Sequence, residues 1–376
     1  MSWFDVLDFW VPMESDTRIR KAEFHVCTVP TDAPEADGTF EWNSTTLVLV
    51  ELTAGDKVGL GYTYGSSAIE PFAKHLFATC LVGQSFLDIP RLNRRMARAL
   101  RNDGGRGIAA MALSMLDVAL WDLKARWLGC SLSQLFGKAR DQAPVYGSGG
   151  FTSYSSKQLR QQLSGWAEAG VGMVKMKVGS APGADPERVK IARDAIGEDT
   201  ELFVDANGAY GARQALRMAE IFREQRVSWF EEPVSADHLV QLRFVRERTP
   251  AGMEIAAGEY AYNAFDFRQI LEAEAVDVMQ ADATRCGGFT GFLYAASVAA
   301  SFGKPISAHC APSLHMHLGC AIRNFRHLEY FHDHVRIERM LFDGFVGQKN
   351  GQMKPDDSQP GLGLMFKRKD ALRYAA

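Results

Sequence analysis

Cysteines are scarce in this chain and follow no recognisable spacing. The 376 residues include six cysteines, none of them in a C-x-x-C pair. Their scatter excludes a disulfide framework or a zinc knuckle, because both need regularly spaced cysteines. We expect reduced and mostly buried thiols at these positions, which are Cys27, Cys80, Cys130, Cys286, Cys310 and Cys320.

The chain also lacks a strong net charge and a long apolar run. Its 42 basic and 45 acidic side chains leave a formal charge of -3, which excludes the polybasic surface that binds nucleic acid or an anionic membrane. The longest uncharged stretch, residues 286–303, contains four glycines and is too polar to span a bilayer. Residues 1–10 contain Asp5 and Asp8 and no basic residue, unlike a secretory signal. We therefore expect a cytoplasmic protein with a small-molecule partner.

The composition is that of a folded protein. Hydrophobic residues make up 47% of the chain and charged residues 23%, which is ordinary for a globular chain and excludes a disordered, collagen-like or coiled-coil protein. Since domains usually hold about 100 to 200 residues, the length fits two domains, or one barrel-sized domain with a smaller attachment.

From residue 145 onward, short strand-like runs alternate with amphipathic helical stretches. In segments such as 212–225 and 264–275, apolar residues recur every three or four positions. This alternation is typical of βαβ units and a parallel sheet. It predicts an α/β fold built on a TIM-type barrel, with eight strands at 145–149, 173–178, 202–207, 227–232, 254–259, 276–282, 305–310 and 327–331.

The part of the chain before the barrel has a different pattern. It predicts two extended segments with a turn at Gly55-Asp56, a loop rich in proline, glycine and aspartate, and a helix. The extended segments are at 17–29 and 46–63, the loop is at 29–46 and the helix is at 108–129. We therefore expect an α+β domain over residues 1–140 and a barrel over 141–349. A polar tail, 350–376, would return over the surface and complete the first domain.

Ionisable residues fall at the ends of the predicted strands. In a TIM barrel the carboxyl ends of the strands meet at one rim, and that rim holds the active site. Each βα unit here delivers a charged or titratable group to the rim, in the order Lys175 and Lys177, Asp205, Glu231, Glu259, Asp282, His309 and Glu329.

Three of these groups are carboxylates on consecutive strands: Asp205, Glu231 and Glu259. They follow residues that must be buried, where an unpaired charge is costly. One such acid could simply cap the next helix, but three that converge repel each other unless a cation lies among them. Oxygen ligands with no companion cysteine or histidine favour Mg²⁺. The sequence therefore predicts a magnesium site at the rim.

The ordered motifs resemble those of the enolase superfamily, specifically its mandelate racemase subgroup. The matching segments are VKMKVG (174–179), VDAN (204–207), WFEEP (229–233), AAGE (256–259), DATRCGG (282–288), SAH (307–309) and LEYF (328–331). Residues 119–129 and 131–148 resemble that family's junction between capping domain and barrel. The resemblance implies a (β/α)7β barrel with an N-terminal α+β capping domain.

The resemblance also implies roles for the rim residues. Asp205, Glu231 and Glu259 would bind Mg²⁺, with Glu231 chosen over Glu232 because the family uses the first acid of that motif. The remaining implied roles are a base at Lys177, a second base at His309 paired with Asp282, stabilisation of the carboxylate-derived oxygens by Lys175 and Glu329, and substrate binding by Asn207.

The chemistry of proton removal beside a carboxylate fits this set. It creates an enediolate with two negative oxygens, so a divalent cation and a lysine aimed at them lower the barrier. Lys177 must be neutral to act as a base, and Lys175, two positions away on the same side of the strand, should lower the pKa of Lys177. Asp282 would fix the tautomer of His309 and support its protonated form.

Further polar side chains could bind a hydroxylated substrate. Trp42 and Asn43 lie in the 29–46 segment, where the family closes a cap over the barrel mouth; an exposed loop tip is the alternative. Other candidates for hydroxyl binding are Thr152, Tyr154 and His315. These polar side chains are more numerous than a small 2-hydroxy acid requires, so they favour a polyhydroxylated substrate.

The leading hypothesis is a Mg²⁺-dependent dehydratase of an acid sugar, acting through α-proton abstraction, an enediolate and loss of the β-hydroxyl as water. Lys177 would take the α-proton and His309 would protonate the leaving hydroxyl, with the opposite assignment left open. The alternatives are a racemase or epimerase of a 2-hydroxy acid and a catalytically silent homologue that binds sugar acids. We expect a small carboxylate as substrate and a homo-oligomeric assembly.

Overall fold

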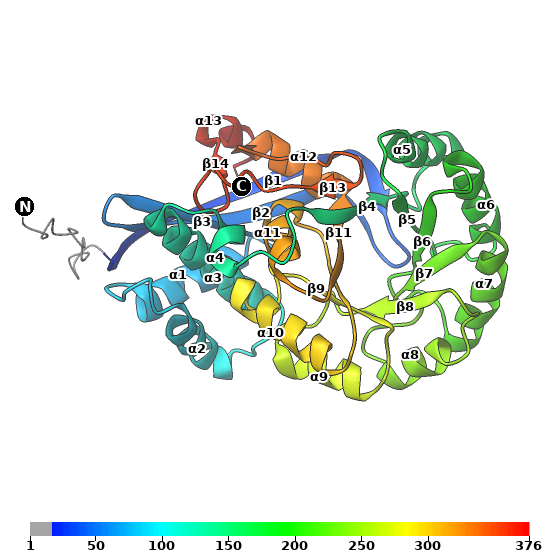
Figure 1. Cartoon of the computed structure of the whole chain (residues 1–376), viewed down its shortest axis with the longest axis horizontal. Coiled ribbons are helices and arrows are strands. Elements are labelled where there is room, and N and C mark those ends of the chain that lie inside the picture. Colours follow the sequence, from blue (N-terminus) through cyan, green and yellow to red (C-terminus); the bar gives the residue numbers. More distant parts are fainter. Residues whose placement is uncertain (1–16, 376) are drawn as a thin grey trace, which may run out of the picture.

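The computed structural model describes residues 17–375 and contains an antiparallel N-terminal sheet with helices beside a closed barrel of parallel strands (Figure 1). Residues 1–16, where the sequence shows no secretory pattern, lie outside the described residues. Among the described residues, no helix is long and apolar enough to cross a membrane.

Eight parallel strands form the barrel, and each overlaps one predicted strand. The ring closes because the last strand pairs with the first, with Leu328 opposite Val145. The predicted TIM-type fold is therefore confirmed. The strands are β4 (Ala143–Gly149), β5 (Met173–Lys177), β6 (Glu201–Asp205), β7 (Val227–Glu231), β8 (Glu254–Ala257), β9 (Val278–Ala281), β10 (Ile306–Ala308) and β11 (Phe325–Phe331).

Helices follow the strands and form the outer ring (Figure 1). They are α5 (Ser156–Glu168), α6 (Asp185–Ile196), α7 (Ala212–Glu224), α8 (Leu239–Arg246), α9 (Ala264–Glu272), α10 (Gly288–Ser301), α11 (Pro312–Ala321) and α12 (His332–Leu341). Phe203 and Trp229 belong to a buried aromatic cluster, and Asp205 and Glu231 lie two residues further along the same strands. Because side chains alternate along a strand, both acids point to the same side as that cluster.

The N-terminal sheet has the order β1-β2-β3, with the expected turn at Gly55-Asp56. Helix α3 packs directly on β3 because Gly61 has no side chain; a Cβ there would lie 2.1 Å from the carbonyl oxygen of Met115. The elements are β1 (Ile19–Ala36), β2 (Glu41–Ala54), β3 (Lys57–Tyr64), α1 (Ile69–Leu76), the π-helical turn η1 (Phe77–Leu81), α2 (Ile89–Ala99), the 3-10 turn η2 (Leu100–Asn102), α3 (Ile108–Leu128) and α4 (Leu132–Phe136).

The prediction of a loop over residues 29–46 is wrong. β1 continues to Ala36 and β2 begins at Glu41, so the segment is the end of a long hairpin. Pro30 still pairs opposite Ser44, and within this segment the register shifts between Pro30 and Glu35. Pro30 and Pro34 are tolerated because β1 is an edge strand. On its outer side no neighbouring strand of the sheet requires the backbone N–H that proline lacks.

The end of this hairpin lies on the barrel. The backbone N–H of Thr152 donates to the carbonyl of Ala36 at 2.8 Å, and its hydroxyl donates to the carbonyl of Asp37 at 2.8 Å. The Ser153 hydroxyl donates to the carbonyl of Pro34 at 2.7 Å. The segment following β4 thus holds the hairpin against the barrel.

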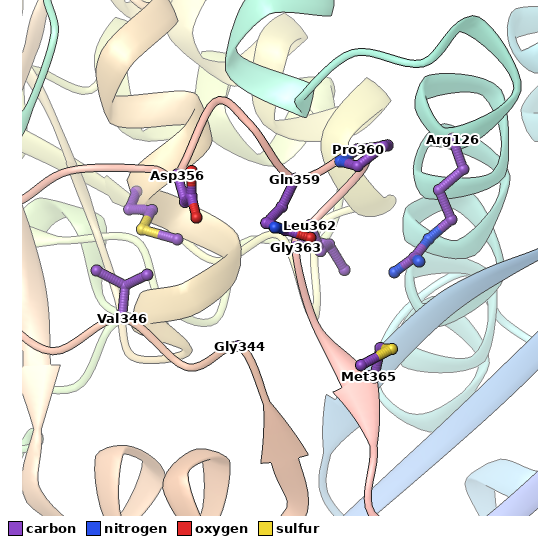
Figure 2. Close-up of a pocket in the computed structure, with 10 residues that line it drawn as sticks. Arg126, Gly344, Val346, Asp356, Gln359, Pro360, Leu362, Gly363 and Met365 are labelled. Carbon is purple, nitrogen blue, oxygen red and sulfur yellow. The ribbon is translucent and has the colours of Figure 1, made fainter.

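The C-terminal tail returns to the N-terminal part of the chain. Asp122 of α3 accepts hydrogen bonds from the backbone N–H groups of Leu60 and Leu362 at 2.7 and 2.6 Å. The tail and Arg126 line a cavity of about 230 Å³, and Figure 2 shows the residues around it. The guanidinium of Arg126 is already bonded to Asp122 and the Leu364 carbonyl. The elements after α12 are β12 (Phe342–Asp343), which precedes the tail, and β13 (Gln352–Met353), β14 (Met365–Phe366), α13 (Arg368–Ala371) and η3 (Leu372–Tyr374) within it.

Candidate active site

The register of the parallel strands brings the three rim carboxylates together. Lys177 lies opposite Asp205, and Asp205 lies opposite Glu231. One oxygen from each of Asp205, Glu231 and Glu259 falls within 4.8 Å of the others, and all three residues are buried. It is Glu231, and not the adjacent Glu232, that joins this cluster.

The cluster fits a hard divalent cation. Burial and the neighbouring charge of Asp205 raise the pKa of Glu231 to about 8, so the acids destabilise one another's charged forms when only protein surrounds them. One carboxylate oxygen of Glu259, Oε2, is buried without a hydrogen-bond partner. Three clustered oxygen donors with an unsatisfied lone pair are the donor set that Mg²⁺ prefers.

The two lysines of β5 are both paired with these acids. The ammonium of Lys175 is fully buried, and its Nζ lies 2.6 Å from Glu231 Oε1, 2.8 Å from Glu329 Oε1 and 3.4 Å from Asp205 Oδ2. Lys177 Nζ lies 2.5 Å from Asp205 Oδ2. Lys177 lines the cavity described below, whereas Lys175 does not.

The charge of Lys175 acts on the pKa of Lys177 in the expected direction, but the net pKa of Lys177 is raised. Burial and the charge of Lys175 act to lower the pKa, but the charges of Asp205, Glu231 and Glu329 together outweigh both and raise the pKa of Lys177 above its ordinary value. The closeness of these acids to Lys177, which a linear motif does not reveal, decides the direction.

His309 is held by Asp282 as expected. His309 Nδ1 lies 2.8 Å from Asp282 Oδ2, so with the carboxylate as acceptor Nδ1 carries the proton. Nε2 lies 3.5 Å from Glu259 Oε2 and 3.3 Å from the thiol of Cys310. Burial alone would lower the pKa of His309, but the charge of Glu259 and the hydrogen bond to Asp282 raise it. The protonated ring is therefore stabilised, as a proton donor requires.

Glu329 is surrounded by donors. Its Oε1 accepts from the hydroxyl of Ser148 at 2.6 Å, and its Oε2 accepts from the backbone N–H of Cys310 at 2.9 Å. Burial opposes ionisation, but the charge of Lys175 holds the pKa of Glu329 well below its usual value. In this arrangement Glu329 positions Lys175. To donate a hydrogen bond to a substrate oxygen, the Glu329 carboxylate would first have to take up a proton.

A cavity of about 470 Å³ lies between the barrel rim and the β1–β2 hairpin. Of the residues expected to bind substrate, Asn207 and Trp42 line it. Asn207 has a φ of 44° and a buried side-chain oxygen without a partner. The barrel contributes Lys177, Asn207, Glu259, Asp282, His309 and Glu329 to the lining.

Four other polar candidates do not reach this cavity. Asn43 is exposed and, being adjacent to Trp42 on a strand, points to the opposite face. Thr152 is bonded to the hairpin, and both ring nitrogens of His315 are used by the backbone of Ala283 and Cys310. Tyr154 is buried outside the lining.

Sequence reasoning missed Arg285, which lines the cavity. Its guanidinium lies 3.5 Å from Glu259 Oε1 and 3.6 Å from Asp282 Oδ2. The signal was available, because a spacing of three residues after Asp282 in DATRCGG places Arg285 on the same side of a helical turn. Cys310 was missed as well, although it directly follows His309.

Sequence reasoning also missed Glu35, which supports Trp42 from behind. The indole N–H of Trp42 donates to Glu35 Oε2 at 2.8 Å, and the ring meets Phe151 edge-on at 5.5 Å between centroids. Burial, followed by the charge of Asp333, raises the pKa of Glu35 to about 9. A protonated acid near the tip of the hairpin therefore holds Trp42, the one large ring expected at the substrate site.

Glu35→Gln is expected to reduce the loss of folding stability that the protein shows as pH rises. Between the ordinary pKa of 4.5 and about 9, the folded chain keeps a proton that the unfolded chain releases. Stability therefore falls as pH rises, by up to about 1.4 kcal/mol per pH unit for one group. The amide keeps the indole acceptor but has no such proton. Thermal unfolding at pH 6 and pH 9 should show a smaller drop for the variant; equal drops would contradict the assignment.

Comparison with known families agrees with the fold. Residues 23–137 match the family described as mandelate racemase / muconate lactonizing enzyme, N-terminal domain, and residues 158–371 match the one described as enolase C-terminal domain-like. A capped barrel with this rim is an enolase-superfamily protein. Within that superfamily, the chain belongs to the mandelate racemase and muconate lactonizing enzyme family.

Individual relatives cover nearly the whole chain. A mandelate racemase/muconate lactonizing enzyme-like protein from Rubrobacter xylanophilus superposes with a TM-score of 0.94 at 49% identity, over 96% of this chain and 100% of that one. L-talarate/galactarate dehydratase from Salmonella typhimurium is 30% identical over 93% of this chain and 89% of its own. Its crystal structure liganded with Mg and L-lyxarohydroxamate has a TM-score of 0.89 at 27% identity, covering 99% and 97% of the two chains. Arabinonate dehydratase from Saccharolobus solfataricus is 28% identical, with coverage of 85% and 88%.

Proposed function

We propose that this protein is a Mg²⁺-dependent dehydratase of an acid sugar. The observation that carries the proposal is one cavity that is lined by Lys177, by the His309–Asp282 pair and by Glu259, which is a member of the three-carboxylate cluster. The names of the Salmonella and Saccharolobus relatives support the reaction class. They include both dicarboxylic and monocarboxylic sugar acids, so they leave the charge of the substrate open.

The cation supplies fixed positive charge beside the substrate carboxylate when it is bound by Asp205, Glu231 and Glu259. Lys177 accepts the α-proton at Nζ, and the C–H electron pair passes into the enediolate. If Asp205 were engaged in holding the cation, its ion pair with Lys177 would weaken, and the neutral amine that a base requires would be favoured at Lys177.

His309 completes the elimination. Its Nε2 donates a proton to the departing β-hydroxyl, the C–O bond breaks, and water leaves. Asp282 on Nδ1 keeps the ring oriented and stabilises the protonated state before transfer. The resulting enol becomes a 2-keto-3-deoxy acid by tautomerisation.

A racemase or epimerase of a 2-hydroxy acid remains the second candidate, because the same two groups approach the cavity from strands that are not neighbours, β5 and β10. Two-base exchange would then move a proton between Lys177 and His309 across the α-carbon. This reaction yields the 2-epimer and no keto-deoxy acid.

A screen of acid-sugar stereoisomers with Mg²⁺, scored for 2-keto-3-deoxy product, tests the proposal. We expect at least one stereoisomer to be dehydrated, and the reaction to stop after the metal is removed with a chelator. Epimerisation without product would favour the racemase, and the absence of both product and α-proton exchange would favour a binding protein.

Gly38→Ala is expected to lower kcat/KM by about 10- to 100-fold, because small displacements of positioning groups are costly. A Cβ at this hairpin position would lie 2.2 Å from the carbonyl oxygen of Ala206 and 2.7 Å from that of Val178, both on the barrel. The substitution therefore pushes the hairpin away from the rim.

The matched control is Gly105→Ala, where a Cβ meets nothing within 4 Å. Steady-state kinetics and thermal unfolding should show an activity loss for Gly38→Ala only, with similar unfolding temperatures for both variants. Equal kcat/KM values in the two variants would show that the seating of the hairpin does not matter for turnover.

A further inference from the structure

The two ends of the cavity differ in charge. At the barrel end lie the acids together with Lys177, Arg285 and His309. The hairpin end is formed by the β1–β2 hairpin and the end of β3, and its lining consists of Asp37, Phe40, Trp42, Ser44, Thr45, Thr46, Tyr64, Gly65 and Ser66. This second set contains hydroxyls, aromatic rings and one carboxylate.

Every cation that lines the cavity within residues 17–375 is at the barrel end and already faces an acid. Lys177 pairs with Asp205, and Arg285 lies beside Glu259 and Asp282. These positive charges offset the rim carboxylates and the reacting end of the substrate.

Basic side chains close to the hairpin bind other partners outside the cavity lining. Arg336 binds Asp333 at 2.6 Å and the carbonyl of Pro30 at 2.6 Å. His332 binds Asp32 at 2.9 Å. Neither residue lines the cavity, so neither offers a direct ion-pair partner to a charge placed there.

The remaining titratable groups at the hairpin end are neutral or negative. His334 stacks on Tyr64 with 3.5 Å between ring centroids, and burial lowers the pKa of His334 to about 3. Asp37 accepts the backbone N–H groups of Thr39 and Phe40 at 2.6 and 2.8 Å. A second substrate carboxylate at this end would lose hydration without a counter-charge and would meet Asp37.

A chain of hydroxyl groups suits the same surface. Ser44, Thr45, Thr46 and Ser66 offer donors and acceptors. The face of Trp42, which stacks with Phe40 at 6.1 Å, offers an apolar contact for C–H groups. Resting on the proposed dehydratase function, we infer that the substrate is a sugar monocarboxylate with an uncharged far end, an aldonate, and not a dicarboxylic aldarate.

Matched aldonates and aldarates of the same configuration test this inference with the Mg²⁺-loaded wild-type protein. We expect kcat/KM for the aldonate to exceed that of its aldarate partner by at least about 10-fold, the discrimination that one uncompensated charge can impose. Equal or better turnover of the aldarate would overturn the inference and leave the dehydratase function standing. If neither class yields keto-deoxy product, the proposed function itself fails.

Asp37→Asn isolates the contribution of charge at the hairpin end. The amide oxygen can still accept the two backbone N–H groups, so the turn is kept while the negative charge is removed. We expect the aldarate-to-aldonate ratio of kcat/KM to rise several-fold. Asp32→Asn, which removes a hairpin charge outside the cavity, should leave the ratio unchanged. A ratio that rises equally in both variants, or in neither, would contradict a local charge effect.

Discussion

Asp205→Asn, Glu231→Gln and Glu259→Gln are each expected to lower kcat/KM for dehydration by about 1000-fold or more, the scale seen when a key electrostatic group is lost. Each change removes a negative charge from a buried cluster whose oxygens lie within 4.8 Å of one another. Each variant should also bind Mg²⁺ more weakly, as measured by calorimetry. Unchanged Mg²⁺ affinity in all three variants would contradict the metal assignment.

Glu232→Gln provides the matched control for this set. Glu232 is buried next to Glu231, and burial followed by the charge of Glu259 raises its pKa well above the usual value. Its side chain is not part of the three-oxygen cluster. We therefore expect Glu232→Gln to retain Mg²⁺ affinity while Glu231→Gln loses it; the reverse result would exchange the two assignments.

His309→Asn is expected to reduce dehydration by about 10²- to 10⁴-fold, the usual contribution of a general acid. Proton removal from the α-carbon depends on Lys177, so exchange of the substrate α-proton for deuterium should remain measurable in D₂O. Proton NMR of the substrate measures this exchange directly.

Lys177→Met is the companion variant for this experiment, and it should lose exchange and dehydration together. If His309→Asn instead loses both while Lys177→Met keeps exchange, His309 is the α-proton base and the two roles are reversed. Comparing the two variants on one substrate therefore assigns each proton transfer to a residue.

The barrel and its rim were predictable because the signals are local. Each strand is a short apolar run, and the group that follows it, such as Asp205 or His309, necessarily reaches the carboxyl edge of a parallel sheet. The choice of Glu231 over Glu232 came from the family resemblance, and the structure brings Glu231 into the cluster.

The hairpin was not predictable in the same way. Its prolines and aspartates have the composition of a loop, and only the edge position of β1 allows them in a strand. Once the segment is a strand, alternation separates Trp42, which lines the cavity, from the exposed Asn43. The direction of the Lys177 pKa and the burial of Glu35 depend on distances that arise only on folding. The cytoplasmic location, the homo-oligomeric assembly and the division between residues 140 and 141 stay predictions.

Proton NMR of the Mg²⁺-loaded protein with an acid sugar in D₂O tests the proposed function most directly. A dehydratase that removes the α-proton and eliminates the β-hydroxyl consumes the substrate. It forms a 2-keto-3-deoxy acid with one deuterium at C3, because tautomerisation of the enol takes one hydron from solvent. Interconversion of 2-epimers with deuterium at C2, and no keto-deoxy product from any acid sugar, would contradict dehydration and identify the protein as an epimerase.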